Sequence, residues 1–106
     1  LGKKAVMVIN PGTAGSCIQP VLSELDGVLI MSVNPGFAKQ KFMPVALAKI
    51  EDLRKQFTKD IAVDGGINEL SAPAAVKAGA NILATASYFF NSPRPKEAVS
   101  FLKSLK

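Results

Sequence analysis

The chain of 106 residues contains no histidine, no tryptophan and a single cysteine, Cys17. One cysteine cannot form an internal disulfide, and no histidine is present to activate it. Cys17 is therefore expected to be a small buried apolar residue in a protein of the reducing cytoplasm. Zinc-site spacing and the P-loop pattern are both missing. Without tryptophan, or aromatics among the basic residues, a platform for single-stranded nucleic acid is not expected.

Long apolar runs are also missing. No stretch approaches the ~20 apolar residues of a membrane span, so no membrane partner is expected. Residues 1–10 have no room for the successive regions of a signal peptide. The net charge of +5 favours anionic partners. Lys39 and Lys41 lie in a loop beside a glycine, whereas the lysines of the predicted helices are interpreted as a solvated surface. These are Lys49, Lys55, Lys59, Lys77, Lys96, Lys103 and Lys106.

Four apolar runs alternate with turn-rich and helical segments. The runs cover residues 5–9, 27–33, 61–63 and 81–86. They are nearly continuous in apolar residues, as in strands of a parallel sheet covered by helices. This alternation predicts one domain of the α/β class.

The segments between the runs have helical spacing. One helix face is predicted from Ala46, Ile50, Leu53 and Phe57. A short helix is bracketed by Pro73 and Gly79, and a last helix is expected from about Lys96. Pro20 and Pro44 suit the first turn of a helix better than its interior.

Four strand-helix units could form a small open sheet or half of an eight-stranded barrel. A half-barrel alone leaves strand edges unpaired and its barrel-facing side chains uncovered. Such a chain either dimerises or is part of something longer.

Turns at the ends of the predicted strands indicate a common mouth. Asn-Pro-Gly follows two successive strands, in the segments 8–13 and 32–37. A third strand ends in the run Asp64-Gly65-Gly66, and Ser87 follows the fourth. Gly65, Gly66, Ser87, Gly36, Lys39 and Lys41 could surround a phosphate group, because glycine lets the backbone approach an anion. The alternative stays open, since Asp-Gly is also a common hairpin turn and serine an ordinary strand end.

Several motifs together resemble the ribulose-phosphate 3-epimerase family. They are LIMSVNPGF (29–37), KFMPVALAKIEDLRK (41–55) and IAVDGGIN (61–68), with VMVINPGT (6–13) and AGANILATAS (78–87) at matching distances. The resemblance implies a (β/α)8 TIM barrel, of which residues 1–106 would form the C-terminal half, strands five to eight.

The resemblance also implies roles for individual residues. Asp64 would bind a divalent metal ion (Zn, Fe, Mn or Co) and act as one of two acid/bases. The second aspartate and the histidine ligands would lie in the absent N-terminal half. Met31 would line the site, although ordinary barrel core remains the alternative for it. The implied substrate and phosphate contacts are Met31, Gly36, Phe37, Ala38, Lys39, Gly65, Gly66, Ala86 and Ser87.

The phosphate loops depart from the family pattern. Ala38, Lys39 and Ala86 stand where the family usually has glycine, and Tyr88 where it has a smaller residue. A Cβ is tolerated at these positions where φ is negative. Lys39 could supply a counter-charge to the phosphate, and Tyr88 could narrow the pocket.

The leading interpretation is a pentose phosphate pathway enzyme that converts D-ribulose 5-phosphate to D-xylulose 5-phosphate. The expected partners are the sugar phosphate and either the missing half-barrel or a second copy of the chain. One alternative is a hexulose-phosphate (allulose 6-phosphate) 3-epimerase. Another is a non-catalytic phosphate-binding half-barrel that dimerises. A nucleic-acid-binding domain would rest on net charge alone and predicts steeply salt-dependent binding to any polyanion.

Overall fold

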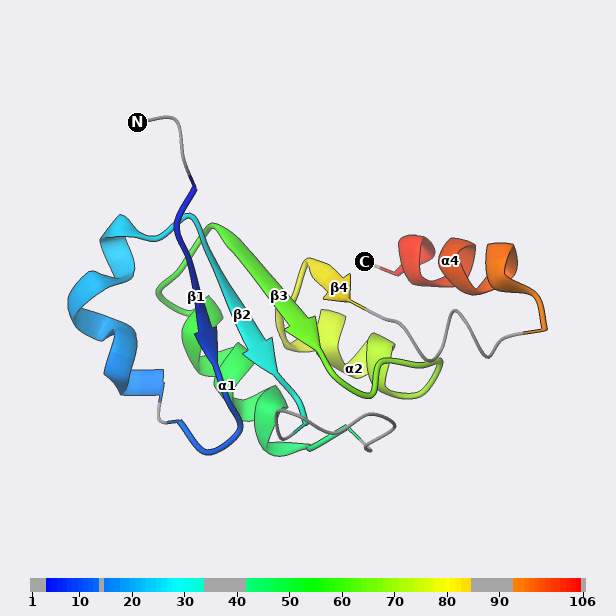
Figure 1. The fold of residues 1–106 in the computed structure, drawn as a ribbon, viewed down its shortest axis with the longest axis horizontal. Coiled ribbons are helices and arrows are strands. Elements are labelled where there is room, and N and C mark those ends of the chain that lie inside the picture. The colour runs from blue at the N-terminus through cyan, green and yellow to red at the C-terminus, as the bar shows by residue number, and fades with distance from the viewer. Residues whose placement is uncertain (1–3, 14, 34–41, 85–92, 106) are drawn as a thin grey trace.

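The four strands form one parallel sheet in the order of the chain. The computed structural model describes residues 4–13, 15–33, 42–84 and 93–105. In these ranges the elements are β1 (Val6–Ile9), the 3₁₀ helix η1 (Gly15–Glu24), β2 (Gly27–Met31), α1 (Val45–Arg54), β3 (Asp60–Asp64), α2 (Ser71–Ala78), β4 (Ile82–Ala84) and α4 (Pro95–Ser104). The strand order is β1-β2-β3-β4 (Figure 1). The predicted α/β fold is confirmed. Among the described helices, none has the length and apolar character that crossing a membrane requires.

The helix boundaries agree with the sequence in most places. Helix α1 begins directly after Pro44, and α2 ends at Gly79, whose φ of 132° favours glycine. The expectation for Pro20 is wrong, because this residue lies inside η1. A 3₁₀ helix has φ values near the one that proline imposes, which makes an interior proline tolerable there. The predicted burial of Cys17 lies outside the described side chains.

One face of the sheet is covered by helices. Ile9, Ile30 and Val63 are neighbours in register and at most 2% exposed. They belong to one apolar cluster with Ile50 of α1 and Ala75 of α2. In Figure 1 both helices lie behind the sheet. The near-continuous apolar strands thus bury one set of alternate residues against helices.

The other face of the sheet is apolar but uncovered. Val8, Leu29, Ala62 and Ile82 are neighbours in register on this face. At its margins Val6, Val8 and Ile82 are 58%, 51% and 44% exposed. No element of the described ranges lies over this face in Figure 1. A contiguous apolar surface of this kind is typical of an interface.

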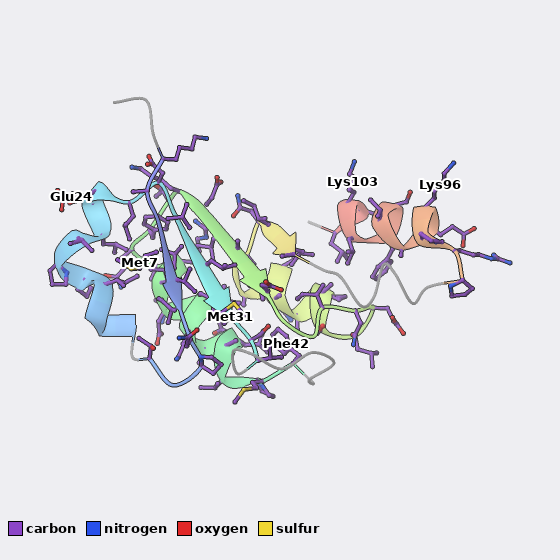
Figure 2. The ribbon with its side chains drawn as sticks, viewed as in Figure 1. Met7, Glu24, Met31, Phe42, Lys96 and Lys103 are labelled. Carbon is purple, nitrogen blue, oxygen red and sulfur yellow. The ribbon has the colours of Figure 1, made fainter. Side chains whose placement is uncertain are left out.

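A groove lies beside β4, the last strand of the sheet. An apolar groove of about 770 Å³ lies between α2, β4 and α4, and Leu83, Val99 and Leu102 contribute to its lining. Helix α4 carries the exposed Lys96 and Lys103, which both project away from the sheet (Figure 2). Their solvated positions confirm the interpretation of these two lysines.

Arg54 connects the end of α1 to the two loops that precede β3 and β4, at the amino ends of these strands. Its Nε donates to the carbonyl of Gly79 at 2.9 Å, and its Nη1 donates to the carbonyls of Phe57 and Lys59 at 2.8 Å each. The planar guanidinium holds these carbonyls in a fixed arrangement, which a single ammonium cannot reproduce.

We expect Arg54→Lys to lower the free energy of unfolding by about 1–2 kcal/mol, because half-buried carbonyls lose their donors. Urea denaturation measures the change. Lys55→Arg is the matched control, since Lys55 is exposed and its ammonium lies 3.8 Å from the Asp52 carboxylate. Equal urea midpoints for wild type and Arg54→Lys would contradict the structural role.

Candidate functional site

The carboxyl ends of the strands place Met31, Asp64 and Ala84 in one row. Met31 pairs with Asp64, and Asp64 pairs with Ala84. Neighbours in register in a parallel sheet share a face, and the preceding Val63 is buried beneath the helices. The row therefore lies at the rim of the uncovered face, and Met31 is seen at the end of β2 in Figure 2. Met31 and Asp64 are therefore neighbours at this rim, and the roles that the resemblance implies for them stay predictions.

Ser32 fixes the backbone that carries Asp64. Its amide donates to the carbonyl of Asp64 at 2.9 Å. Its hydroxyl lies 3.1 Å from the same carbonyl and also contacts the carbonyl of Gly65. Its own carbonyl accepts from the amide of Met43 at 2.7 Å, and the side chain is fully buried. Ser32 therefore connects the end of β2, the Asp64 turn and the segment that leads into α1.

The turn after Asp64 contains two glycines with positive φ, and Gly65 has no space for a side chain. Gly65 has φ of 124° and Gly66 has φ of 67°. A Cβ at Gly65 would lie 2.7 Å from Val33 Cγ2 and 2.9 Å from its backbone nitrogen. The hydroxyl of Ser71 donates to the carbonyl of Gly66 at 2.6 Å, which holds the second half of the turn. The backbone thus turns sharply just beyond the carboxylate.

Asn68 and Ser71 cap the start of α2 reciprocally. The Asn68 side-chain oxygen accepts from the amides of Leu70 at 2.8 Å and Ser71 at 3.0 Å. The Ser71 hydroxyl in return accepts from the Asn68 amide at 3.0 Å. This is the pattern of a capping box, which satisfies otherwise unpaired amides. The loop from Asp64 to α2 is therefore tied at both ends.

The Asp64 side chain is half-buried, and no donor from the described part of the chain binds its carboxylate. A carboxylate oxygen in this position fits one coordination site of a divalent cation. The described residues contain no group of three or more potential metal ligands. The segments outside the described ranges contain no histidine, aspartate or glutamate. Asp64 thus fits as a single carboxylate ligand among the described residues.

Known proteins are similar to this chain over most of its length. Residues 1–90 match the ribulose-phosphate 3 epimerase family. The chain belongs to this family. It is 42% identical to the ribulose-phosphate 3-epimerase of Methanocaldococcus jannaschii, covering 97% of this chain and 46% of that protein. It is 40% identical to the enzyme of that name from Bacillus subtilis, covering 99% of this chain and 51% of that protein. The chloroplastic ribulose-5-phosphate-3-epimerase of Arabidopsis thaliana is 44% identical, over 100% of this chain and 40% of that protein.

The chain spans about half the length of these relatives. Members of the epimerase family are (β/α)8 barrels, and the four parallel strands are half of such a barrel. The uncovered sheet face has a direct explanation in this fold, because barrel strands turn this face toward the lumen. The row of Met31 and Asp64 then lies at the barrel mouth, where active sites of this fold are found.

Several residues that the resemblance assigns to the epimerase site lie outside the described residues. They are Gly36, Phe37, Ala38, Lys39, Ala86 and Ser87, together with Lys41 and Tyr88 of the same loops. Their roles in binding a sugar phosphate stay predictions.

Two residues at this end of the sheet escaped the sequence analysis. Ser32 lies inside the SVNPGF motif, and a small polar residue directly after an apolar strand was the available signal. The interpretation of Lys49 as a solvated lysine is wrong, because its ammonium contacts carbonyls of residues 10–13. No sequence pattern marks such a role, since the partners are backbone atoms that any residue could provide.

Proposed function

We propose that this chain is the C-terminal half of a ribulose-phosphate 3-epimerase, an isomerase that converts D-ribulose 5-phosphate to D-xylulose 5-phosphate. The observation that carries the proposal is the placement of Asp64 at the rim of the uncovered face, beside Met31. The names of the relatives support the substrate class. The single cysteine supports a cytoplasmic location.

Inversion at C3 requires removal of a proton from one side of the carbon and return of a proton to the other. The C3 proton is acidic because the adjacent ketone stabilises the resulting enediolate. We assign Asp64 as the acid/base on one side, since its backbone is held by Ser32 and the Gly65-Gly66 turn. The acid/base on the other side belongs to a segment outside this chain. Fixed carboxylates on opposite sides are an efficient arrangement for general acid–base catalysis.

Asp64 is also our proposed ligand for a divalent metal ion, with Zn, Fe, Mn and Co as candidates. Such an ion, when bound, supplies Lewis-acid stabilisation of the developing negative charge. One carboxylate oxygen of Asp64 would coordinate the ion at the barrel mouth, and the turn after Asp64 would hold the backbone in place. Its half-buried, unpaired carboxylate within the described part of the chain supports this role.

The phosphate end of the substrate is assigned to the loops after β3 and β4. Gly65 and Gly66 both have positive φ, and turns of this kind can direct successive backbone amides at an anion. The loops after the last two strands are a frequent phosphate site in this fold. The Gly36–Lys39 segment and Ala86-Ser87 complete the proposed site.

The uncovered face of the sheet is proposed to pack against the N-terminal half of the barrel. Its exposed valines and Ile82, with the apolar groove beside β4, support a partner of complementary apolar character. Four further parallel strands would pair with the open edges of β1 and β4. A second copy of this chain is the other possible occupant.

The test follows deuterium incorporation at C3 of D-ribulose 5-phosphate in D₂O, by NMR, with a divalent metal added. The chain is measured alone and mixed with the N-terminal half of the Methanocaldococcus jannaschii relative. We expect incorporation in the mixture and little or none for the chain alone. Allulose 6-phosphate serves as the competing substrate, and its faster exchange would favour the hexulose-phosphate alternative.

Light scattering of both samples separates the remaining outcomes. Exchange by the chain alone, as a dimer, would identify a second copy as the occupant of the uncovered face. A stable complex that binds sugar phosphate without exchanging C3 would contradict the epimerase function and favour a non-catalytic phosphate-binding barrel.

A further inference from the structure

The ammonium group of Lys49 is surrounded by backbone carbonyls of the turn that follows β1. Lys49 lies in α1, and its Nζ donates to the carbonyls of Asn10 at 3.0 Å, Pro11 and Thr13. An ammonium has three N–H donors and no acceptor. All of them are therefore directed at one turn, 36 to 39 residues away in the sequence.

The turn itself has a regular geometry. The amide of Thr13 donates to the carbonyl of Asn10 at 2.9 Å, which closes a four-residue turn with Pro11 and Gly12 at its centre. Gly12 does not have a positive φ, so the turn is not of type II. Its carbonyls would repel one another without a cation, because several partial negative charges converge on one point.

Asn10 continues the uncovered face of the sheet. Ile9 is the last residue of β1 and is buried, whereas Asn10, which begins the turn, is exposed. Successive residues of a strand point to opposite faces of the sheet. Asn10 therefore lies on the same face as Val8. The register of β1 and β2 ends at Ile9 and Ile30, so Asn10 directly follows the last pair, as Met31 does on β2. Asn10 thus follows β1 at the same end of the sheet at which Met31, Asp64 and Ala84 are neighbours in register.

We propose that Lys49 is a positioning residue: it clamps turn 10–13 so that the Asn10 carboxamide contacts the hydroxyl groups of the sugar phosphate. The inference rests on the proposed epimerase function for its ligand. A carboxamide both donates and accepts hydrogen bonds, which suits hydroxyl groups of a sugar. The turn lies two strands away from the Gly65-Gly66 turn assigned to the phosphate, so Asn10 serves the sugar end.

The test uses the 106-residue chain, labelled with ¹⁵N and mixed with the N-terminal half of the Methanocaldococcus jannaschii relative, and four variants of the labelled chain. Lys49→Met removes the ammonium and keeps an unbranched side chain, while Lys49→Arg keeps the charge. Asn10→Ala removes the carboxamide, and Lys55→Met is the control at an exposed lysine directly after the same helix. The readouts are hydrogen exchange of the Thr13 amide and affinity for D-ribulose 5-phosphate and for inorganic phosphate. Protection of the Ile61 and Val63 amides reports that each variant is folded.

We expect Lys49→Met to accelerate exchange of the Thr13 amide by roughly 10-fold or more, because the turn opens locally. The affinity for D-ribulose 5-phosphate should fall by about 10-fold, the equivalent of one lost hydrogen bond. The affinity for inorganic phosphate should stay within about 2-fold of the wild-type value. Asn10→Ala should reproduce the loss of sugar-phosphate affinity without changing Thr13 exchange. Lys49→Arg should restore part of both properties, and Lys55→Met should match wild type.

Other results overturn the inference. If the Thr13 amide of Lys49→Met exchanges at the wild-type rate, Lys49 does not hold the turn. If Asn10→Ala binds the sugar phosphate with wild-type affinity, the Asn10 side chain does not contact it. If Lys49→Met lowers the affinities for both ligands equally, the substitution disturbs the whole site, which overturns the positioning role of Lys49. If the wild-type mixture of half-barrels binds inorganic phosphate but not D-ribulose 5-phosphate, the substrate assignment and the Asn10 contact fail together. Thr13 exchange then still decides whether Lys49 clamps the turn.

Discussion

Asp64→Asn is expected to lower deuterium incorporation at C3 of D-ribulose 5-phosphate by at least ~100-fold in the completed barrel, since positioned acid/bases contribute this much or more. Asparagine keeps the size of the side chain but cannot accept the C3 proton. It is also a weaker ligand for a divalent cation than a carboxylate. The measurement is the NMR rate of loss of the C3 proton in the mixture of half-barrels.

Asp60→Asn is the matched control for this experiment. Asp60 begins the same strand that Asp64 ends, and its carboxylate accepts from the Asn81 side chain at 2.9 Å. Both substitutions remove one negative charge from β3, but only Asp64 lies at the barrel mouth. Similar exchange rates for Asp64→Asn and wild type would remove Asp64 from the mechanism. Similar losses in both variants would point to charge or stability rather than to proton transfer.

Gly65→Ala is expected to lower the free energy of unfolding by about 3 kcal/mol. The φ of 124° at this position is one that side-chain-bearing residues rarely adopt. The added Cβ would also lie within 3.0 Å of the Val33 backbone nitrogen and the Ser32 hydroxyl. Because these neighbours are buried, they have little room to move. Urea denaturation of the chain gives the change directly.

Gly12→Ala is the control for the glycine effect. Gly12 has no heavy atom within 4 Å of an added Cβ and no positive φ. Alanine there is expected to change stability by less than about 1 kcal/mol, and in the stabilising direction, because it restricts the unfolded chain. Equal destabilisation by both substitutions would contradict the strained conformation at Gly65.

Much of the site could be predicted from the sequence because its residues follow strands directly. The apolar run 61–63 ends at Asp64, and the run 27–33 contains Met31. Carboxyl ends of parallel strands meet at one edge of a sheet, so both residues had to lie near each other. The glycines after Asp64 indicated a sharp turn, because glycine readily adopts positive φ. These signals are local in the sequence, and the parallel α/β fold brings the residues that carry them close together.

The contacts that hold the site could not be read in the same way. Ser32 and Lys49 bind backbone carbonyls, and a carbonyl carries no signature of its residue type. Lys49 resembles every other lysine on a helix until the sheet register brings turn 10–13 beside α1. The interior position of Pro20 was missed because a 3₁₀ helix and an α-helix share much of their sequence pattern.

The sequence by itself determined the parallel α/β class, the membership of the epimerase family and the position of Asp64 at the end of a strand. Apolar periodicity and turn residues act over a few residues, and they suffice for the fold class and for the position of Asp64. Family membership was indicated by the resemblance of whole motifs. Only the tertiary structure decided which sheet face the helices cover, which groups clamp the turns after β1 and β3, and that an apolar face stays open. These properties depend on strand register and on contacts between distant segments, because the free energy of burial comes from surfaces that meet only after folding.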